Sequence, residues 1–442
     1  MNAEDEKILK TPYLKIGRKL HLLLHTGQLL MEGGADTNRI VRDMMRAAVF
    51  MGIPEPQVHL HITYTTLMLN VSDDDHSYTS FRKCRRHGAN MDVIAAVNRL
   101  TWAATEAHYS LDDYETELIR ITKRHRCYPD FLSCIGAGIA CGGFSTLFGG
   151  DAIAFLCTAI CASLGFWLRR LFNEWEVNPY VSVTIAAFVS TFFAWFSQFV
   201  SGSATPWHPM IACSLFIVPG IPLINAVDDM LNNYIIAGAT RAINTLLVVG
   251  GMTFGIILTI RLGSVNDFTT MNVVPDSIYL VHAIAAAIGA IGFSVIFNVP
   301  RRLVPVTALG AILSVCLRNF FNLELGSGPI AGSFIGAAAV SLMTLITSRR
   351  FNVPTHVLSI PSVIPLVPGV LLYRVLFSII NIKQLTAGAL MLSIQTGVEA
   401  VLIIISIAVG VAIPNLFARH YIDRQKRRRM EKIFAGNTPP NE

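Results

Sequence analysis

The sequence predicts an α-helical polytopic membrane protein of about ten transmembrane helices, built as a 5+5 inverted repeat behind a small N-terminal cytoplasmic α+β domain. Three observations support this fold class. The 442 residues are 52% hydrophobic and only 14% charged, with a mean hydropathy of +0.51, which is too apolar for a soluble chain of this length. The first 128 residues are rich in Arg, Asp, Glu and His, whereas most of the rest is nearly uncharged. Finally, two apolar runs are broken by Pro-Gly pairs at matching positions.

Residues 1–128 have the size and mixed patterning of a small cytoplasmic α+β domain. Gly33-Gly34 ends the first helical pattern, and Asp36 or Thr37 could cap the second helix. The first ten residues lack the apolar core of a cleavable signal peptide, so we expect none. Periodicity predicts helices over 13–31, 37–51, 91–107 and 111–125, one or two strands over 58–71, and a partner strand over 77–82.

Apolar runs follow one another from residue 131 onwards, and each is near the roughly 17–25 residues that cross a bilayer. We expect a first transmembrane repeat over 129–264, a second over 277–414, and a basic cytoplasmic tail over 415–442. The ten expected spans are 131–149, 152–168, 180–199, 210–227, 242–262, 278–298, 303–319, 329–347, 357–374 and 386–413.

The positions of Lys and Arg predict the orientation in the membrane. With the N-terminal domain inside, the cytoplasmic loops hold arginine pairs, and an even number of spans returns the basic tail to the cytoplasm. We therefore expect both termini on the cytoplasmic side of an inner membrane. The basic groups could contact anionic lipids, and they need no nucleic-acid partner. The cytoplasmic markers are Arg169-Arg170, Arg241, Arg301-Arg302, Arg349-Arg350 and Arg424 to Arg429, against scattered Arg261, Arg318, Arg374 and Lys383 outside.

An internal repeat relates the two halves of the apolar region. GGFSTLF (142–148) matches IGFSVIF (291–297) at a separation of 149, and 13 of the 36 positions over 137–172 are identical at that offset. The same offset pairs Val218-Pro219-Gly220 with Val367-Pro368-Gly369. Because each half holds an odd number of spans, the second copy must enter the membrane from the opposite side, as in many secondary transporters. Duplication without transport is the alternative.

The stretch FIVPGIPLINAVDDMLNNYIIAGATR (216–241) starts as a span and breaks at Pro219 and Gly220. Pro removes a backbone donor, and freed backbone at membrane depth is tolerated only inside protein or beside a water-filled cavity. Asn225, Asp228 and Asp229 lie at or near the end of this span. A broken helix with polar groups is how many transporters build a solute site, so we expect the two broken spans to share a polar pocket near the midplane. A kink followed by an ordinary loop is the alternative.

The chain resembles the threonine/serine exporter family from about residue 16 to residue 414. The resemblance rests on GQLLMEGGADTNRIVRDMMR (27–46), GAGIACGGFSTLFGGD (136–151), PGIPLINAVDDMLNNYIIAGATR (219–241) and PLVPG (365–369). It implies export of small polar metabolites such as threonine and serine, and some members are associated with dicarboxylates such as succinate. The family's pattern falls on Pro219, Gly220, Asn225, Asp228 or Asp229, Gly238 and Arg241.

Two kinds of cargo make different demands on these residues. Asp228 and Asp229 could bind a substrate ammonium, while helix N-termini at the Pro219-Gly220 and Pro368-Gly369 breaks hold its carboxylate. For a dicarboxylate, two Asp residues would be unfavourable, and Arg241 would have to dominate. A solvated acid pair or a helix cap is the plainer interpretation of the two Asp residues.

Glu399 is the carboxylate that lies deep within an apolar span, in LSIQTGVEAVLIIISI. Intramembrane acids are expensive to bury and therefore point to function. We hypothesise that Glu399 carries a coupling proton, with Gln395 one turn away on the same face. A Glu that only hydrogen-bonds a neighbour for packing is the alternative.

The sequence predicts no enzyme, no cofactor and no metal site. It contains no GxGxxG, Walker, HExxH or GxSxG motif. The eight cysteines form no CxxC pair and are interpreted as packing residues. His59 and His61 alternate on a strand without a partner at ligand spacing, and Asp73 to Asp75 lack the Gly and Glu of a calcium loop.

The function predicted is a secondary exporter of a small-molecule substrate, most simply threonine or serine, driven by an ion gradient, with a proton as the expected ion. Membrane lipid and a possible homo-oligomer are the expected partners. A dicarboxylate exporter is the alternative within transport. A membrane sensor, whose N-terminal domain binds a ligand and whose spans only signal, is the alternative from another class.

Overall fold

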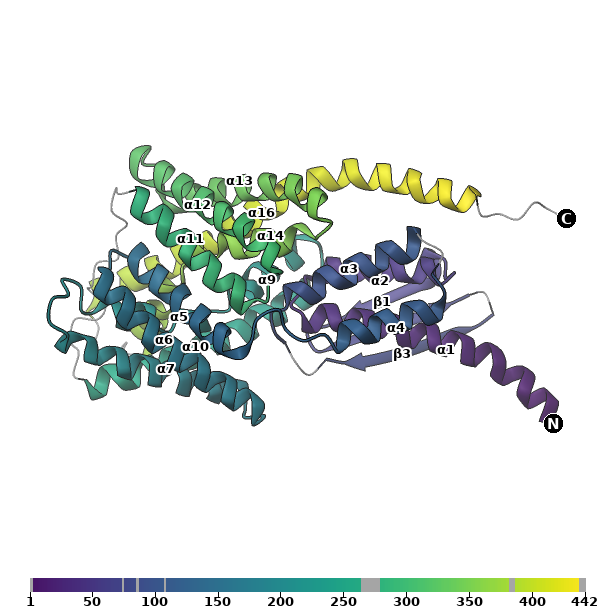
Figure 1. Cartoon of the computed structure of the whole chain (residues 1–442), viewed down its shortest axis with the longest axis horizontal. Helices are drawn as coiled ribbons and strands as arrows, with labels where there is room; N and C mark the ends of the chain where they lie inside the picture. The colour runs from purple at the N-terminus through teal and green to yellow at the C-terminus, as the bar shows by residue number, and fades with distance from the viewer. Residues whose placement is uncertain are drawn as a thin grey trace.

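The N-terminal part of the chain is a three-stranded sheet packed against helices (Figure 1). The computed structural model describes residues 3–73, 75–84, 87–106, 109–263, 279–380 and 386–436. These helices and strands lie within a few residues of the predicted ones, except that α1 begins earlier. The elements are α1 (Ala3–Glu32), α2 (Thr37–Phe50), a short 3-10 turn (Glu55–Gln57), β1 (Val58–Ile62), β2 (Thr66–Ser72), β3 (Ser77–Lys83), α3 (Met91–Glu106) and α4 (Leu111–Thr122).

The sheet is antiparallel, with β2 in the middle between β1 and β3. Leu67, Leu69 and Val71 alternate along β2 and are buried, so one face of the sheet forms the core with the helices. His59 and His61 on β1 are exposed, which agrees with their interpretation as surface histidines. This core holds the α1–α2 loop in a fixed position.

The α1–α2 loop has a tightly specified shape. Gly34 has φ +88°, and a Cβ there would lie 2.6 Å from the carbonyl oxygen of Gly88, so only glycine fits. Asp36 caps α2, because its side chain accepts a hydrogen bond of 2.8 Å from the Arg39 amide. The loop therefore presents Gly34 to Thr37 in one defined geometry.

The rest of the chain is a bundle of long apolar helices. By length and composition, eight helices of the described residues could cross a membrane, and two bent pairs bring the number to ten if each pair is one span. The bent pairs are His208–Ile217 with Gly220–Leu231, at 56°, and Thr355–Leu366 with Gly369–Ile379, at 61°.

The membrane elements follow the expected order. They are α5 (Asp130–Leu147), α6 (Ala152–Glu174), α7 (Pro179–Trp195), α8 (His208–Ala212), α9 (Gly220–Leu231), α10 (Ile235–Leu262), α11 (Tyr279–Ile296), α12 (Val304–Asn319), α13 (Gly328–Phe351), α14 (Thr355–Val363), α15 (Gly369–Ile380) and α16 (Ala387–Gly436). Short 3-10 turns lie at Phe196–Phe199, Leu215–Ile217, Arg301–Leu303 and Ile364–Leu366, and a π turn lies at Phe320–Glu324.

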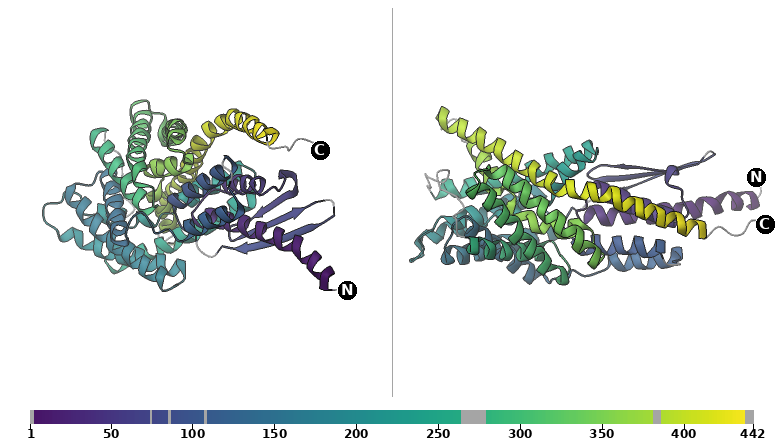
Figure 2. Two further views of the ribbon diagram at one scale, coloured as in Figure 1. Left: turned by 45° about the vertical axis from the view of Figure 1, so that its right-hand side comes forward. Right: turned by 90° about the horizontal axis from the view of Figure 1, so that it is seen from above.

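The last helix is longer than expected. α16 continues through Pro414 to Gly436, whereas the sequence predicts a span that ends at 413 and a separate tail. Pro414 removes one backbone donor, and the Asn415 side chain donates to the Val411 carbonyl oxygen beside it. In Figure 2 this helix runs from the membrane bundle past the N-terminal part. Lys383, Arg85-Arg86 and the side chains of Arg424 to Arg429 lie outside the described residues.

The two broken spans contact each other at their breaks. At each break a tight turn forms, with Gly220 N donating to Val218 O and Gly369 N donating to Val367 O, both at 2.8 Å. A Cβ on Gly220 would lie 2.5 Å from Ile364 Cδ1, and a Cβ on Gly369 would lie 3.0 Å from Leu215 Cδ2. Each break is thus covered by the residues just before the other break.

A small cavity of about 20 Å³ lies between the two breaks, with room for about one water molecule. Its lining is apolar, whereas we expected a polar pocket at this point. The polar residues of α9 lie further along the helix. The lining residues are Phe144, Phe148, Leu215, Val218, Gly220, Phe293, Ile364, Val367 and Gly369.

Helices α5 and α11 pack closely through glycine. A Cβ on Gly143 would lie 2.8 Å from the carbonyl oxygen of Ala285, and one on Gly292 would lie 2.4 Å from that of Gly136. Since the contacts pair the end of one helix with the start of the other, the two helices are antiparallel. Phe144 and Phe293 meet edge to face between them, with ring centroids 5.6 Å apart.

The glycine contact between α5 and α11 predicts a stability difference between two Gly→Ala substitutions. Gly292→Ala forces its methyl group against the α5 backbone, so we expect a loss of about 1–3 kcal/mol from overpacking and a lower thermal unfolding midpoint in detergent. Gly250→Ala in α10 is the matched control, because a Cβ there meets nothing within 4 Å. An equal midpoint for both variants would contradict the packing described.

Candidate functional site

The α1–α2 loop docks on the second half of the first broken span. Asn225 on α9 donates from Nδ2 to the carbonyl oxygen of Gly34, at 2.9 Å. Two turns further, Asn232 accepts from Asn38 at 3.1 Å. From Gly220 to Asp228 the helix rises about 12 Å at 1.5 Å per residue. The contact therefore lies well away from the break, at what we call the docked end, the end of the membrane helices that contacts the N-terminal part.

Asp229 is the centre of this contact. Its side chain is fully buried and accepts from the Thr37 amide at 2.8 Å and from the Thr37 hydroxyl at 2.9 Å. Arg241 forms an ion pair with it at 2.9 Å and also donates to the carbonyl oxygen of Ala35 at 3.0 Å. A carboxylate at the first turn of α2 is favoured by the free amides and the helix dipole. One buried anion thus joins α2, α9 and α10.

A second cluster lies beside Asp229. Asp36, Asp228 and His356 each offer a ligand atom, and these atoms lie within 4.8 Å of one another. Oδ2 of Asp36 is 3.7 Å from Nδ1 of His356 and 3.6 Å from Nε of Arg39. The three residues come from the α1–α2 loop, from α9 and from the first turn of α14. The cluster therefore connects the N-terminal part to both broken spans.

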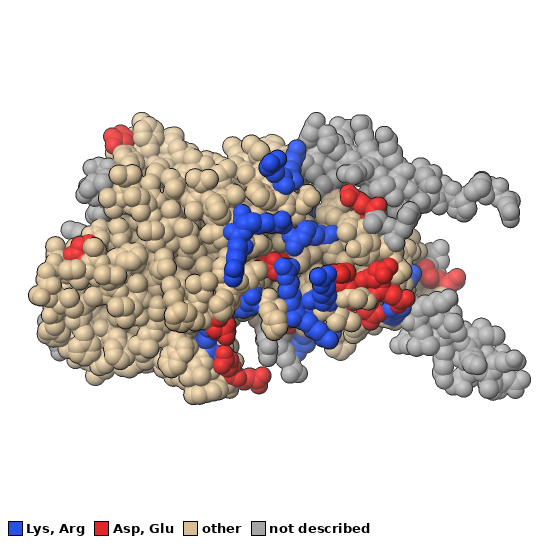
Figure 3. Space-filling model, viewed as in Figure 1, with Lys and Arg blue, Asp and Glu red and all other residues tan. Residues whose placement is uncertain are grey.

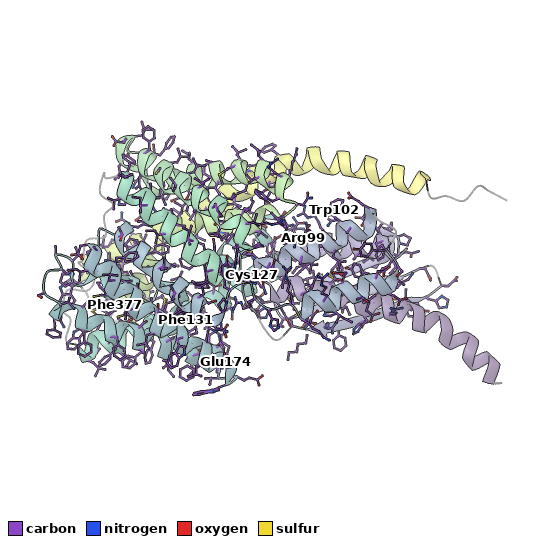
Figure 4. The ribbon with its side chains drawn as sticks, in the orientation of Figure 1. Arg99, Trp102, Cys127, Phe131, Glu174 and Phe377 are labelled. Carbon is purple, nitrogen blue, oxygen red and sulfur yellow. The ribbon has the colours of Figure 1, made fainter. Side chains whose placement is uncertain are left out.

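Two further contacts hold the N-terminal part on the docked end. Tyr64 in the β1–β2 turn accepts from Asn244 on α10 at 3.0 Å and stacks on His87 at 4.1 Å, and burial raises the pKa of its phenol. On the other side, the Cys127 amide donates to Asn298 Oδ1 at 2.8 Å. Figure 4 shows Cys127 at this boundary, between Arg99 and Phe131, with Phe377 towards the far end of the bundle.

Charged side chains are distributed unevenly along the long axis of the molecule. In Figure 3 the lysines and arginines on the visible face gather around the N-terminal part and its boundary with the bundle, and most of the bundle surface is uncharged. Arg170 pairs with Asp130, and Arg301 donates to the Cys127 carbonyl oxygen at that boundary. The uncharged surface is what lipid requires.

The predicted site residues fall into three groups. The two breaks, Pro219-Gly220 and Pro368-Gly369, are brought together. Asn225, Asp228, Asp229 and Arg241 are also brought together, but at the docked end rather than beside the breaks. Gln395 is exposed and Glu399 is half-buried on α16, and no hydrogen bond or ion pair among the described residues joins either of them to the cluster.

Two residues of the site were not predicted from the sequence. The sequence indicates Asp36 only as a helix cap, and no motif in it marks His356. They are separated by 320 residues, so no local spacing connects them. The only signal was the type of each residue: an acid after a Gly-Gly pair, and a histidine next to a broken span.

Two family profiles together cover most of the chain. A profile described as "Putative threonine/serine exporter" matches residues 21–263. A second, described as "Threonine/Serine exporter, ThrE", matches residues 282–417. The matched ranges contain the α1–α2 loop, both broken spans and α16 down to Phe417.

Individual relatives are more distant. The chain is 21% identical to a threonine/serine exporter of Corynebacterium glutamicum over 92% of this chain and 84% of that protein. It is 21% identical to a "Probable threonine/serine exporter" of Mycobacterium tuberculosis over 81% of this chain and 69% of that protein. It is 28% identical to a "Probable succinate transporter subunit YjjP" of Escherichia coli over 52% of this chain and 88% of that protein. No solved structure matches the chain.

The buried ion pair predicts a large and partly reversible stability effect. Arg241→Gln leaves the Asp229 carboxylate buried without its guanidinium, which costs about 3–5 kcal/mol, so we expect a sharply lower unfolding midpoint and yield. Asp229→Asn in the Arg241→Gln background removes the uncompensated charge and should recover part of that loss. If the double variant is as unstable as the sum of both single variants, the two side chains are not coupled.

Proposed function

Because the chain belongs to the threonine/serine exporter family, we propose that it is a secondary active exporter of small polar amino acids, with threonine and serine as its cargo. The observation that carries this proposal is the contact between two broken spans inside an apolar bundle. Breaks of this kind free backbone groups for a solute or an ion, and they make a helix able to bend. An ion gradient supplies the energy, since the sequence contains no Walker motif.

We propose that residues 129–264 and 277–414 are inverted copies of one unit. The contacts at the breaks support this, because adding 149 to the residue numbers of the first repeat gives the equivalent residues of the second, and each contact then has an equivalent contact. Gly220 contacts Ile364, and Gly369 contacts Leu215, which are equivalent pairs. The antiparallel packing of α5 on α11 through equivalent glycines is a second line of support. Such copies allow the pathway to open to each side in turn by rocking one unit against the other.

The proposed cargo pathway runs from the docked end to the breaks. Asn225 and Asp228 would bind the substrate ammonium at the docked end. The starts of α9 at Gly220 and α15 at Gly369, about 12 Å away along α9, would face the carboxylate of a substrate that has moved on to the breaks. The pairing of Arg241 with Asp229 favours an amino acid over a dicarboxylate, because this arginine is already engaged by a buried anion. In this proposal Asp229 has a structural role, because it holds the α1–α2 loop on α9 and α10.

The conformation described is closed to cargo. The cavity between the breaks has a volume of about 20 Å³, which holds one water but no amino acid. At the docked end, the α1–α2 loop covers α9 through Gly34 and Thr37. We place both termini in the cytoplasm, so the docked end faces the cytoplasm. Release of the α1–α2 loop would then admit cargo from that side of the inner membrane.

Glu399 is proposed to carry the coupling proton. It lies half-buried on α16 among apolar residues, where an ionised carboxylate is expensive, so proton uptake and release can be coupled to movement of α16. Gln395 lies one turn earlier on the same face of α16, and its side chain is exposed.

Counterflow in proteoliposomes tests the cargo. Vesicles that contain the full-length protein and unlabelled threonine should accumulate labelled threonine and serine, whereas labelled succinate should stay outside. The relatives named as succinate transporter subunits make succinate the informative comparison. Accumulation of succinate alone would replace the proposal with dicarboxylate export, and movement of none of the three would favour a sensor.

Replacement of Glu399 tests the coupling. In Glu399→Gln vesicles we expect uptake driven by a pH gradient to fall at least tenfold, because the side chain no longer exchanges a proton, while counterflow without a gradient persists. Ser393→Ala, on the same helix, is the control. An unchanged rate with an unchanged pH dependence in Glu399→Gln would show that Glu399 does not carry the proton.

A further inference from the structure

Three ligand-type side chains converge where the N-terminal part meets the two broken spans. Asp36, Asp228 and His356 place their ligand atoms within 4.8 Å of one another, and these residues are only 1%, 3% and 5% exposed. They come from three elements far apart in the sequence. An arrangement of two carboxylates and one imidazole in a buried site is typical of a cation site.

The local charge favours a bound cation. Three carboxylates, those of Asp36, Asp228 and Asp229, lie at this junction. Arg39 approaches Asp36 at 3.6 Å, and Arg241 pairs with Asp229 at 2.9 Å. These carboxylates have little access to water, and buried charge is costly unless it is compensated, so a divalent cation bound here would lower that cost.

Two buried side-chain oxygens beside the cluster provide an independent indication. Oδ1 of Asn225 and Oγ of Ser359 have no hydrogen-bond partner among the described residues, and both residues are fully buried. Asn225 lies one turn before Asp228 on the same face of α9, and its Nδ2 reaches Gly34, two residues from Asp36. Ser359 lies one turn after His356 on α14. Buried oxygens normally have a partner, so these two indicate a ligand at this position.

The ligand set selects the type of ion. An imidazole nitrogen suits zinc and other transition metals better than Mg²⁺ or Ca²⁺, and carboxylate and amide oxygens also suit Mn²⁺. Metal–ligand bonds of about 2.0–2.2 Å separate adjacent tetrahedral ligands by roughly 3.3 Å. The Asp36–His356 distance of 3.7 Å is close to that value, so small side-chain movements would complete the site.

We propose that Asp36, Asp228 and His356 bind one divalent transition-metal ion, Zn²⁺ or Mn²⁺, with Asn225 Oδ1 as an additional oxygen. The ion connects the α1–α2 loop to α9 and α14, so it fastens the N-terminal part over the docked end and stabilises the closed conformation. It also engages the carboxylate proposed for the cargo ammonium, so metal and cargo compete for Asp228. Metal binding itself is independent of export and is measured without transport.

Isothermal titration of the full-length protein in detergent, after treatment with EDTA and its removal, tests the proposal. We expect saturable binding of one Zn²⁺ or one Mn²⁺ per chain. Asp228→Asn and His356→Gln should each weaken binding at least tenfold, whereas His208→Gln, far along the chain and bonded to the Phe148 carbonyl oxygen, should bind like the wild type. Binding that both site variants retain would overturn the proposal.

A Co²⁺ spectrum gives a test that does not depend on the variants. Co²⁺ in the site should show weak visible bands from nitrogen and oxygen ligands, and these bands should disappear when Zn²⁺ is added. A strong near-ultraviolet thiolate band would mean that the ion binds one of the eight free cysteines instead, and no visible band at all would mean that no such site forms. Either result contradicts the assignment.

Discussion

The structure depends on one constraint: backbone that is freed inside a membrane must be covered by protein. Pro219 and Pro368 interrupt two helices, and the backbone released there has no water to bond with. Each break meets the constraint with a tight turn and with the side chains that precede the other break. Each broken span therefore depends on its counterpart, and Phe144 on α5 and Phe293 on α11 line the cavity between the two breaks.

The N-terminal part is attached to the second half of one broken span. A single buried carboxylate, Asp229, takes the free amide of Thr37 and the guanidinium of Arg241. The loop that supplies Thr37 also supplies Asp36. The contact of Thr37 with Asp229 and the proposed metal site are therefore expected to form together and to break together. Movement of the N-terminal part and bending of α9 are thereby coupled in the proposed export cycle.

Much of this arrangement could be predicted from residue patterns. Hydropathy located the spans, the Pro-Gly pairs located the breaks, and the offset of 149 related them. The depth of the polar residues could not be predicted, because Asn225, Asp228 and Asp229 follow the break so closely that a midplane pocket was the natural expectation. Their partners, Gly34, Thr37 and His356, come from remote parts of the chain. The continuation of α16 past Pro414 was not predicted because a proline removes one hydrogen bond and can kink a helix without ending it.

Cysteine cross-linking across the breaks tests the central claim most directly. In a background without the native cysteines, Val218→Cys with Gly369→Cys, and the equivalent pair Val367→Cys with Gly220→Cys, should each form an intramolecular disulfide rapidly on mild oxidation in membranes. Val218→Cys with Gly388→Cys is the control, since a side chain at 388 meets nothing within 4 Å. If neither equivalent pair links faster than the control, the two broken spans do not meet, and the account fails.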